Sequence, residues 1–170
     1  MRTAISYAAA IGGVAMSLML TGAAQSQALK TGYYAVDAAA LTPTQAGHPY
    51  VKLTGMLYNI STAGQCFSTG INLPHRATIT RVVVWYTGGT AIYPSIEFAL
   101  VRHKMADGTG EQVAYAKLSN KSEPRKTQGL VPAAAHATVD NTQYVYGIDL
   151  CMAPDGASFY GARVAYTYTP

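Results

Sequence analysis

Residues 159–168, FYGARVAYTY, decide the fold, because side-chain character alternates through the whole stretch. Successive side chains of a β-strand point to opposite faces of its sheet. The stretch therefore predicts a strand over Phe159–Tyr168 with two distinct faces. One face is expected to carry Tyr160, Ala162, Val164, Tyr166 and Tyr168, and the other Phe159, Gly161, Arg163, Ala165 and Thr167.

Short apolar runs separated by Gly, Pro, Asn and Asp continue upstream, and no stretch has the spacing of an amphipathic helix. Further strands are predicted at Tyr33–Ala38, Val51–Tyr58, Gln65–Leu73, Ala77–Thr87, Ile96–Lys104, Gln112–Ser119 and Gln143–Met152. Many short strands with regular turn signals are typical of an all-β sandwich or barrel. We therefore expect one antiparallel β-sandwich domain over residues 29–170.

The run Val82–Tyr86 (VVVWY) is apolar at every position. Such a run indicates a central strand that is buried on both faces, with Trp85 in the core. On this prediction, Val83→Asp would place an unpaired carboxylate in the core and prevent folding. The same core is expected to contain Ile96, Phe98, Leu100, Tyr146, Ile148, Val164 and Tyr166.

Connections between the predicted strands differ in length. Asp107–Gly110 and Pro154–Gly156 carry the residues that tight turns favour, and both indicate hairpins. Ser119–His136 is long and polar with two prolines, which predicts a crossover loop within one domain.

The first 28 residues follow the plan of a secretory signal peptide. Arg2 supplies the basic start, and Ala8–Leu20 is an uncharged apolar run of about 13 residues, too short as a helix to cross a bilayer core of roughly 30 Å. Cleavage is predicted after Ala28, with Ala24 as the alternative. We expect an exported chain, periplasmic or extracellular, without stable membrane insertion.

Cys66 and Cys151 are the two cysteines of the chain. An even pair in an exported protein favours a disulfide. Closing so long a loop is worth about 4 kcal/mol in the chain-entropy model.

Charge and spacing argue against several classes of function. A formal net charge of +4 with scattered basic residues gives little support for nucleic acid binding. The four histidines lack the spacing of a metal site, and no nucleophile motif is present. We therefore name no catalytic residue, metal ligand or cofactor. Glu97 and Asp149 are the carboxylates that lie well inside predicted strands, which keeps a small secreted hydrolase as an alternative.

Tyrosine outnumbers the other aromatic residues, with 13 tyrosines against three phenylalanines and one tryptophan. Rings with a polar edge serve as stacking platforms for sugars and as anchors in protein interfaces, although tyrosine is also a good strand former. The candidate platform residues are Tyr33, Tyr34, Tyr50, Tyr58, Tyr86 and Tyr93.

Four segments resemble a recurrent module of exported bacterial proteins with the pattern LPxGATIT … VDNxxYxY … LYGxRIxY. These segments are VDAAALTP (36–43), NLPHRATIT (72–80), VDNTQYVY (139–146) and FYGARVAY (159–166). The resemblance implies a jelly-roll-like β-sandwich and assigns no active site. Arg76 stands where the module usually has glycine, so the turn there is expected to differ.

These observations favour a non-catalytic β-sandwich that acts by binding or assembly, with a glycan or a protein as its partner. A carbohydrate-binding module is the first alternative, and the small hydrolase is the second. Oligomeric state is left open.

Overall fold

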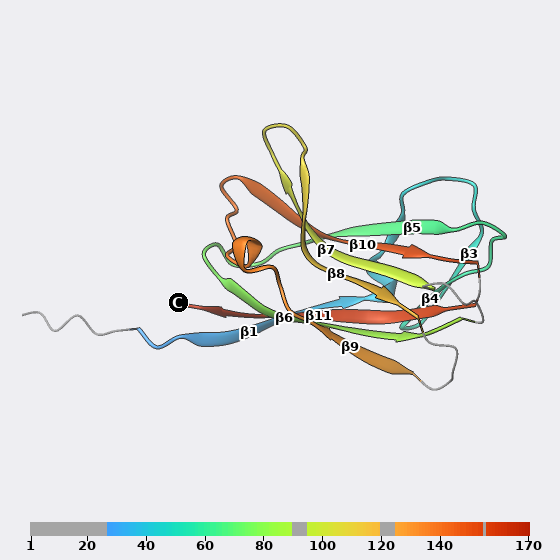
Figure 1. Ribbon diagram of the computed structural model, residues 1–170, viewed down its shortest axis with the longest axis horizontal. Coiled ribbons are helices and arrows are strands. Elements are labelled where there is room, and N and C mark those ends of the chain that lie inside the picture. The colour runs from blue at the N-terminus through green and yellow to red at the C-terminus, as the bar shows by residue number, and fades with distance from the viewer. Residues whose placement is uncertain (1–26, 90–94, 120–124, 155) are drawn as a thin grey trace, which may run out of the picture.

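The computed structural model describes residues 27–89, 95–119, 125–154 and 156–170, and shows two antiparallel β-sheets packed face to face (Figure 1). The predicted signal peptide lies outside the described residues except for its last two positions, and Tyr93 lies outside them as well. No helix among the described residues is long and apolar enough to cross a membrane.

The six-stranded sheet has β11 at its centre, with β6 along one side and both β1 and β4 along the other. Its strands are β1 (Lys30–Asp37), β3 (Tyr50–Leu53), β4 (Met56–Asn59), β6 (Thr78–Thr87), β9 (Lys126–Leu130) and β11 (Ser158–Tyr168). The five-stranded sheet has the order β2-β5-β10-β7-β8. Its strands are β2 (Thr42–Pro43), β5 (Gln65–Ile71), β7 (Ile96–Lys104), β8 (Gly110–Leu118) and β10 (Tyr144–Met152). Single 3₁₀ turns occupy Ala38–Ala40 and Ala134–His136.

The inner faces of the two sheets form one hydrophobic core. Phe98 of β7 and Phe159 of β11 are both fully buried and stack across it, with ring centroids 6.3 Å apart. Each such side chain contributes about 1.5–3 kcal/mol by leaving water. Outside β6, the expected core positions are buried except for Tyr166, which is half-buried against the core. The predicted all-β sandwich is therefore confirmed.

A β-bulge corrects the predicted faces of β11. The register with β6 shifts between Phe159 and Gly161, so Phe159 lies inside while Tyr160 and Arg163 lie on the outer side. Gly161 has φ 153°, and a Cβ there would lie 2.7 Å from the carbonyl oxygen of Val36. A bulge adds one residue to a strand, which reverses the alternation on one side of it.

Strand β6 corrects a second prediction. Val82, Val84 and Tyr86 face the core, but Val83 and Trp85 lie on the outer face and are only half-buried. On the outer face no second sheet packs on Trp85, and the long side chain of Arg163 lies near its ring instead. Val83→Asp is therefore no longer expected to prevent folding.

Three other predicted features also differ from the structure. The predicted hairpin at Pro154–Gly156 is wrong, because the flanking strands β10 and β11 belong to different sheets. Val51–Tyr58 is a hairpin, β3 and β4, around Gly55 at φ 71°. The expected crossover loop contains β9, which pairs with the edge of β6 although only Leu130 of that strand is buried. Backbone hydrogen bonds at a sheet edge do not require apolar side chains, so the polar sequence of β9 gives no pattern from which a strand could be predicted.

The turn at Arg76 has a left-handed backbone conformation, which glycine adopts most readily. Arg76 has φ 64°, the only positive φ of a non-glycine residue among those described. The backbone N–H of Arg76 donates to the carbonyl of Val139, and that of Ala77 to the carbonyl of Pro74.

Candidate functional site

The outer face of the six-stranded sheet carries aromatic rings and guanidinium groups in alternation. We call this surface the arginine–aromatic face and define it by Tyr33, Arg163, Trp85, Tyr160 and Arg125. The Cζ atom of Arg163 lies 4.9 Å from the ring centroid of Tyr33 and 5.7 Å from that of Trp85. The Cζ atom of Arg125 lies 3.8 Å from the ring centroid of Tyr160. Cation–π attraction favours both arrangements.

The register explains how this face is assembled. Ala35 of β1 and Val83 of β6 lie opposite Arg163 on either side of β11, and Gly161 lies opposite Trp85. Small residues around the arginine and the rings leave a depression of about 280 Å³. Its lining includes Ala35, Asp37, Trp85, Tyr160, Gly161 and Arg163.

Asp37 lines this depression from the end of β1. Its Oδ1 accepts a hydrogen bond of 2.7 Å from the backbone N–H of Ala39. This bond caps the following 3₁₀ turn and uses part of the carboxylate's hydrogen-bonding capacity.

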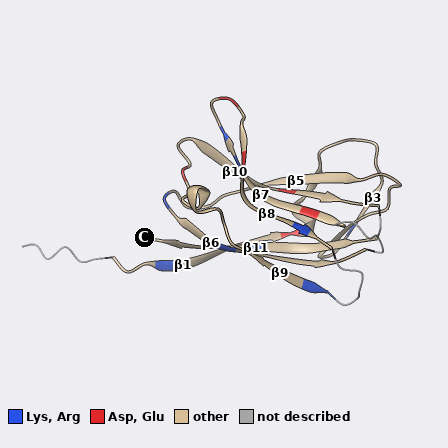
Figure 2. Cartoon of the chain, viewed as in Figure 1, with Lys and Arg blue, Asp and Glu red and all other residues tan. Residues whose placement is uncertain are grey.

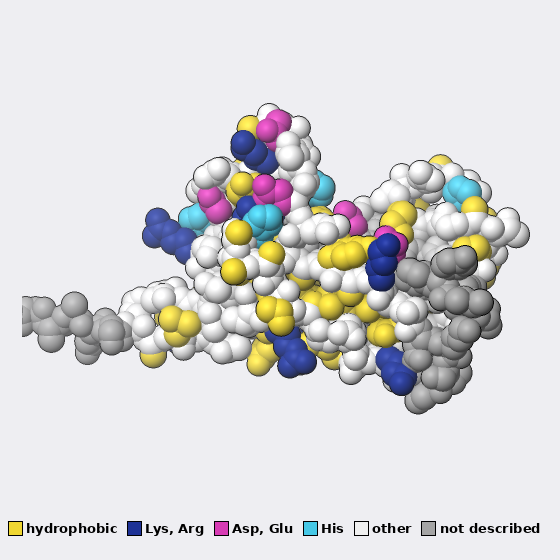
Figure 3. Space-filling view, viewed as in Figure 1, with side chains coloured by type: hydrophobic (Ala, Val, Ile, Leu, Met, Phe, Trp, Pro, Cys, Tyr) yellow, Lys and Arg dark blue, Asp and Glu magenta, His cyan; other side chains and the backbone are white. Residues whose placement is uncertain are grey.

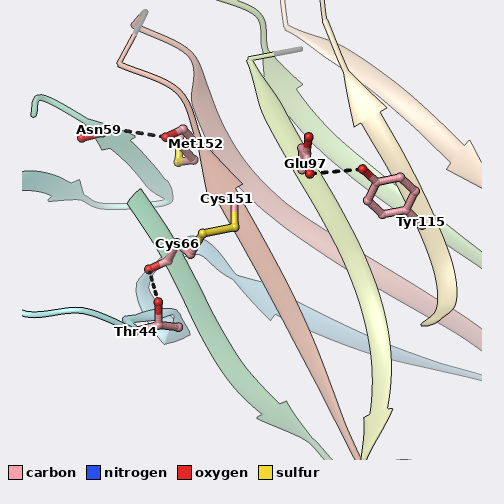
Figure 4. Close-up of a disulfide and its surroundings, with 7 residues drawn as sticks. All are labelled: Thr44, Asn59, Cys66, Glu97, Tyr115, Cys151 and Met152. Carbon is pink, nitrogen blue, oxygen red and sulfur yellow. Dashed lines mark hydrogen bonds between the residues drawn. A yellow bond between two sulfur atoms is a disulfide. The ribbon is translucent and has the colours of Figure 1, made fainter. Parts of the chain in front are cut away.

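The outer face of the five-stranded sheet has a different chemistry. We call it the disulfide face, because Cys66 of β5 and Cys151 of β10 lie opposite one another and are bonded, with Cα atoms 4.0 Å apart. The predicted disulfide is confirmed. Figure 4 shows the bridge and, on the neighbouring strands, Glu97 and Tyr115. Figure 3 shows the surface dipping between the projecting β7–β8 turn and the opposite end of this sheet.

Glu97 is the centre of a small polar network on the disulfide face. The hydroxyl of Tyr115 donates to Glu97 Oε2 at 3.1 Å, and Lys117 Nζ lies 3.4 Å from Glu97 Oε1. The hydrogen bond and charge of Glu97 raise the pKa of Lys117. The pKa of Tyr115 is also raised, first by desolvation and then by its bond to Glu97.

The two candidate hydrolytic carboxylates share one depression on this face. Glu97 and Asp149 both line a hollow of about 160 Å³, beside Cys151. Glu97 is already bound by Tyr115 and Lys117. A general acid and its partner carboxylate would have to act across a sugar bond placed in this hollow. Within the described part of the chain, no group of three or more His, Cys, Asp or Glu residues could hold a metal ion.

A third hollow, of about 500 Å³, lies at one end of the sandwich. Asn72, Asn141 and Tyr144 line it. The side-chain amide of Asn141 donates to the carbonyl of Leu73, and Arg102 lies over the ring of Tyr144, with Cζ 4.2 Å from the centroid. These side chains join loops to strands, which is a structural task.

The candidate platform tyrosines do not form one surface. Tyr33 is 60% exposed on the arginine–aromatic face. Tyr86 is 7% exposed and lies in the core, where burial raises the pKa of its hydroxyl. Tyr34, Tyr50 and Tyr58 are half-buried against the core, and the ring of Tyr50 meets that of Phe67 edge-on at 5.2 Å.

Sequence reasoning missed Arg163, Arg125 and Tyr160, and assigned Trp85 to the core. An arginine in the middle of an otherwise apolar strand was the available signal, because its charge must reach water or a partner. Which rings surround it depends on the order of β1, β11 and β6, which no local pattern reveals.

No family model and no curated protein matches the sequence. Solved structures do match. A xylan-binding module, CBM15, aligns with a TM-score of 0.51 and 11% identity over 80% of this chain and 97% of that one. The C-terminal CBM6 of LamC, a marine laminarinase from Zobellia galactanivorans, aligns with a TM-score of 0.48 and 14% identity. This alignment covers 78% of this chain and 98% of that one. The likeness to the xylan-binding module shows a shared β-sandwich fold.

Proposed function

We propose that this chain is an exported, non-catalytic β-sandwich that binds a glycan on its arginine–aromatic face. The observation that carries the proposal is Tyr33, a residue that is 60% exposed and lies beside Arg163, whose guanidinium group also lies near the ring of Trp85. Aromatic rings that gather on one exposed face, rather than singly, are typical of a surface that a partner covers. The fold shared with a xylan-binding module supports the same proposal.

The size of the face suits an extended sugar chain. It runs across the neighbouring strands β1, β11, β6 and β9, a width of roughly 14 Å at about 4.8 Å per strand. Tyr33 and Trp85 are held on two of these strands, so they are pre-positioned and lose little conformational freedom on binding. A sugar ring can stack on each of them.

Export rests on the disulfide and on the predicted signal peptide. Disulfides persist in oxidising compartments, and Cys66 and Cys151 are paired. We expect the mature chain to begin after Ala28. Intact-mass analysis of protein secreted by the native host tests this, and a mature chain that still starts at Met1 would refute export by cleavage.

Trp85 makes the glycan proposal easy to test, because it is the single tryptophan of the chain. Titrating purified protein with soluble polysaccharides should change tryptophan fluorescence if ligand covers this face. Tyr33→Ala should weaken binding by about 1–3 kcal/mol if the ring is an anchor.

Tyr115→Ala is the matched control, since Tyr115 is a tyrosine 39% exposed on the disulfide face. It should leave the affinity unchanged. If Tyr115→Ala weakened binding and Tyr33→Ala did not, the glycan would lie on the disulfide face instead.

A second candidate function is glycoside hydrolysis on the disulfide face. The observation in its favour is that Glu97 and Asp149 line the same hollow. Release of reducing ends from a polysaccharide, abolished by both Glu97→Gln and Asp149→Asn, would establish it and overturn the non-catalytic proposal.

A further inference from the structure

We propose that the ligand of the arginine–aromatic face is an anionic polysaccharide, one whose sugars carry carboxylate or sulfate groups. This inference rests on the proposed function and specifies its substrate class. It follows from how the arginines of this face are held, compared with the basic residues of the rest of the molecule.

Basic residues on the five-stranded sheet have acidic partners. Arg102 is paired with Glu111, Lys117 with Glu97, and Lys104 with Asp107 in the β7–β8 turn. On the arginine–aromatic face, neither Arg163 nor Arg125 has a carboxylate within ion-pair distance among the described residues.

Arg81 extends the same pattern. It lies on the outer face of β6, and its guanidinium group lies over Gly129 of β9, because a Cβ built on Gly129 would lie 2.5 Å from its Nη2 atom. It too has no ion-pair partner within the described chain. Asp37 is the only acidic residue on the strands of the six-stranded sheet. Figure 2 shows the resulting contrast, with blue segments along this sheet and most of the red on the other sheet and its hairpin.

A guanidinium group held near a ring can still bind an anion. The rings of Tyr33, Trp85 and Tyr160 attract the positive charge of the group, with Cζ 3.8 to 5.7 Å from the ring centroids, and offer its N–H donors no oxygen acceptor. Those donors match the two oxygens of a carboxylate or sulfate. An arginine held in this way is thus partly ordered before the anion arrives.

The same rings favour a sugar chain over a simple anion. Rings and guanidinium groups alternate along the face, so a polymer with a stacking surface and a charge on each unit satisfies both. A nucleic acid also offers stacking and charge. The modest net charge of +4 and the disulfide, which marks an oxidising compartment, favour a polysaccharide.

The test uses two pairs of probes that share a sugar backbone and differ in charge: polygalacturonate against its methyl ester, and dextran sulfate against dextran. Fluorescence of Trp85 in the intact protein reports binding. The charged member of a pair should bind at least about tenfold more tightly. Raising NaCl from about 50 mM to about 500 mM should remove most of this preference.

Variants then locate the charge. Arg163→Gln should weaken binding of the charged probe about tenfold and leave the neutral probe nearly unchanged, and Arg163→Lys should fall between. Lys117→Gln removes the same charge from the disulfide face and should change affinity by less than about twofold. Arg81→Gln provides an independent variant should Arg163→Gln fail to fold, which circular dichroism would reveal.

Each outcome has a separate meaning. Equal affinity for charged and neutral probes would overturn this inference and leave glycan binding in place. No binding of any polysaccharide would overturn both. Equal losses from Arg163→Gln and Lys117→Gln would show attraction to net charge without a site, and tighter binding of single-stranded poly(dT) would identify a nucleic acid ligand instead; either result overturns the inference.

Discussion

The two outer faces of this sandwich hold their charged residues in different ways. On the disulfide face, Glu97 accepts a hydrogen bond from Tyr115 and lies beside Lys117 on the neighbouring strand. On the arginine–aromatic face, Arg163 lies against Tyr33 and Trp85 and has no carboxylate partner among the described residues. Both faces are cross-strand ladders of an antiparallel sheet.

The difference shows what a cross-strand partner decides. Lys117 lies opposite Glu97, so its charge is paired within the protein and does not require a ligand. Arg163 lies near rings on both neighbouring strands instead, which hold it in place without giving its N–H donors a carboxylate. The kind of cross-strand neighbour therefore separates a surface whose charges are paired within the protein from one suited to a charged ligand.

The largest expected effect tests whether the arginine–aromatic face is an outer surface at all. Val84 is fully buried and Val83, its neighbour on β6, is half-buried on this face. Val84→Asp should prevent folding, because a carboxylate without a partner in the core costs several kcal/mol. Val83→Asp should fold and lose about 1 kcal/mol. Circular dichroism and thermal unfolding of the two variants measure this.

Val83→Asp also acts on the proposed site. Val83 lies directly opposite Arg163, so the new carboxylate would stand beside the guanidinium group and compete with an anionic ligand. Affinity for polygalacturonate should fall while the fold persists. Failure of both variants to fold would mean that β6 is buried on both faces, as its apolar sequence alone suggests.

The comparison also shows how far sequence reasoning reaches. The segment Ile96–Lys104 predicts β7 with its bounds, and Ile96, Phe98 and Leu100 were correctly expected in the core. Burial of Ala99 and Val101 on the other side was not expected. The disulfide was predictable from an even cysteine count and the expected export. Strand β9 was not, because its residues Lys126–Gly129 are polar and its place depends on backbone pairing with β6.

The candidate site needed more than local pattern. Arg163 is conspicuous in the sequence, but its contact with Tyr33 depends on β1 lying beside β11, and its contact with Trp85 depends on β6 lying on the other side. The bulge before Gly161 then places Tyr160 outside and Phe159 inside. A glycine within a strand signals a bulge only weakly.

Removing the disulfide should have the next largest effect on the free energy of unfolding and should leave ligand affinity unchanged. Cys66 and Cys151 are separated by 85 residues, and losing so long a closed loop costs about 2–4 kcal/mol. The double variant Cys66→Ser, Cys151→Ser should unfold at lower temperature yet bind ligand as before. An unchanged unfolding midpoint would contradict a stabilising role, and lost affinity would link the two faces.

Glycine substitutions on the two faces give a matched comparison of intermediate size. Gly161→Ala requires φ near 153° and places Cβ 2.7 Å from the Val36 carbonyl oxygen, so it should cost about 1–3 kcal/mol. Gly70→Ala on the disulfide face makes no such contact, because the new Cβ would lie 4.0 Å from its nearest atom, the carbonyl oxygen of Tyr146. This variant should cost less than about 1 kcal/mol. Chemical denaturation measures both, and equal losses would argue against the bulge.

The smallest expected effect concerns titration of the disulfide face. The hydrogen bond and charge of Glu97 raise the pKa of Lys117 above its ordinary value of 10.5. A raised pKa in the folded state means that the interaction is fully present below pH 10.5 and is lost as pH rises through the folded-state pKa. Glu97→Gln should return the pKa of Lys117 toward 10.5, whereas Asp149→Asn, in the same hollow, should leave it raised.

NMR titration of the Lys117 side chain measures this pKa, and an unchanged value in Glu97→Gln would show that Glu97 does not hold the lysine. The same variant separates the two faces, because Glu97 and Arg163 lie on opposite outer faces. Glu97→Gln should leave the affinity for polygalacturonate unchanged, so a loss of affinity in this variant would move the site to the disulfide face.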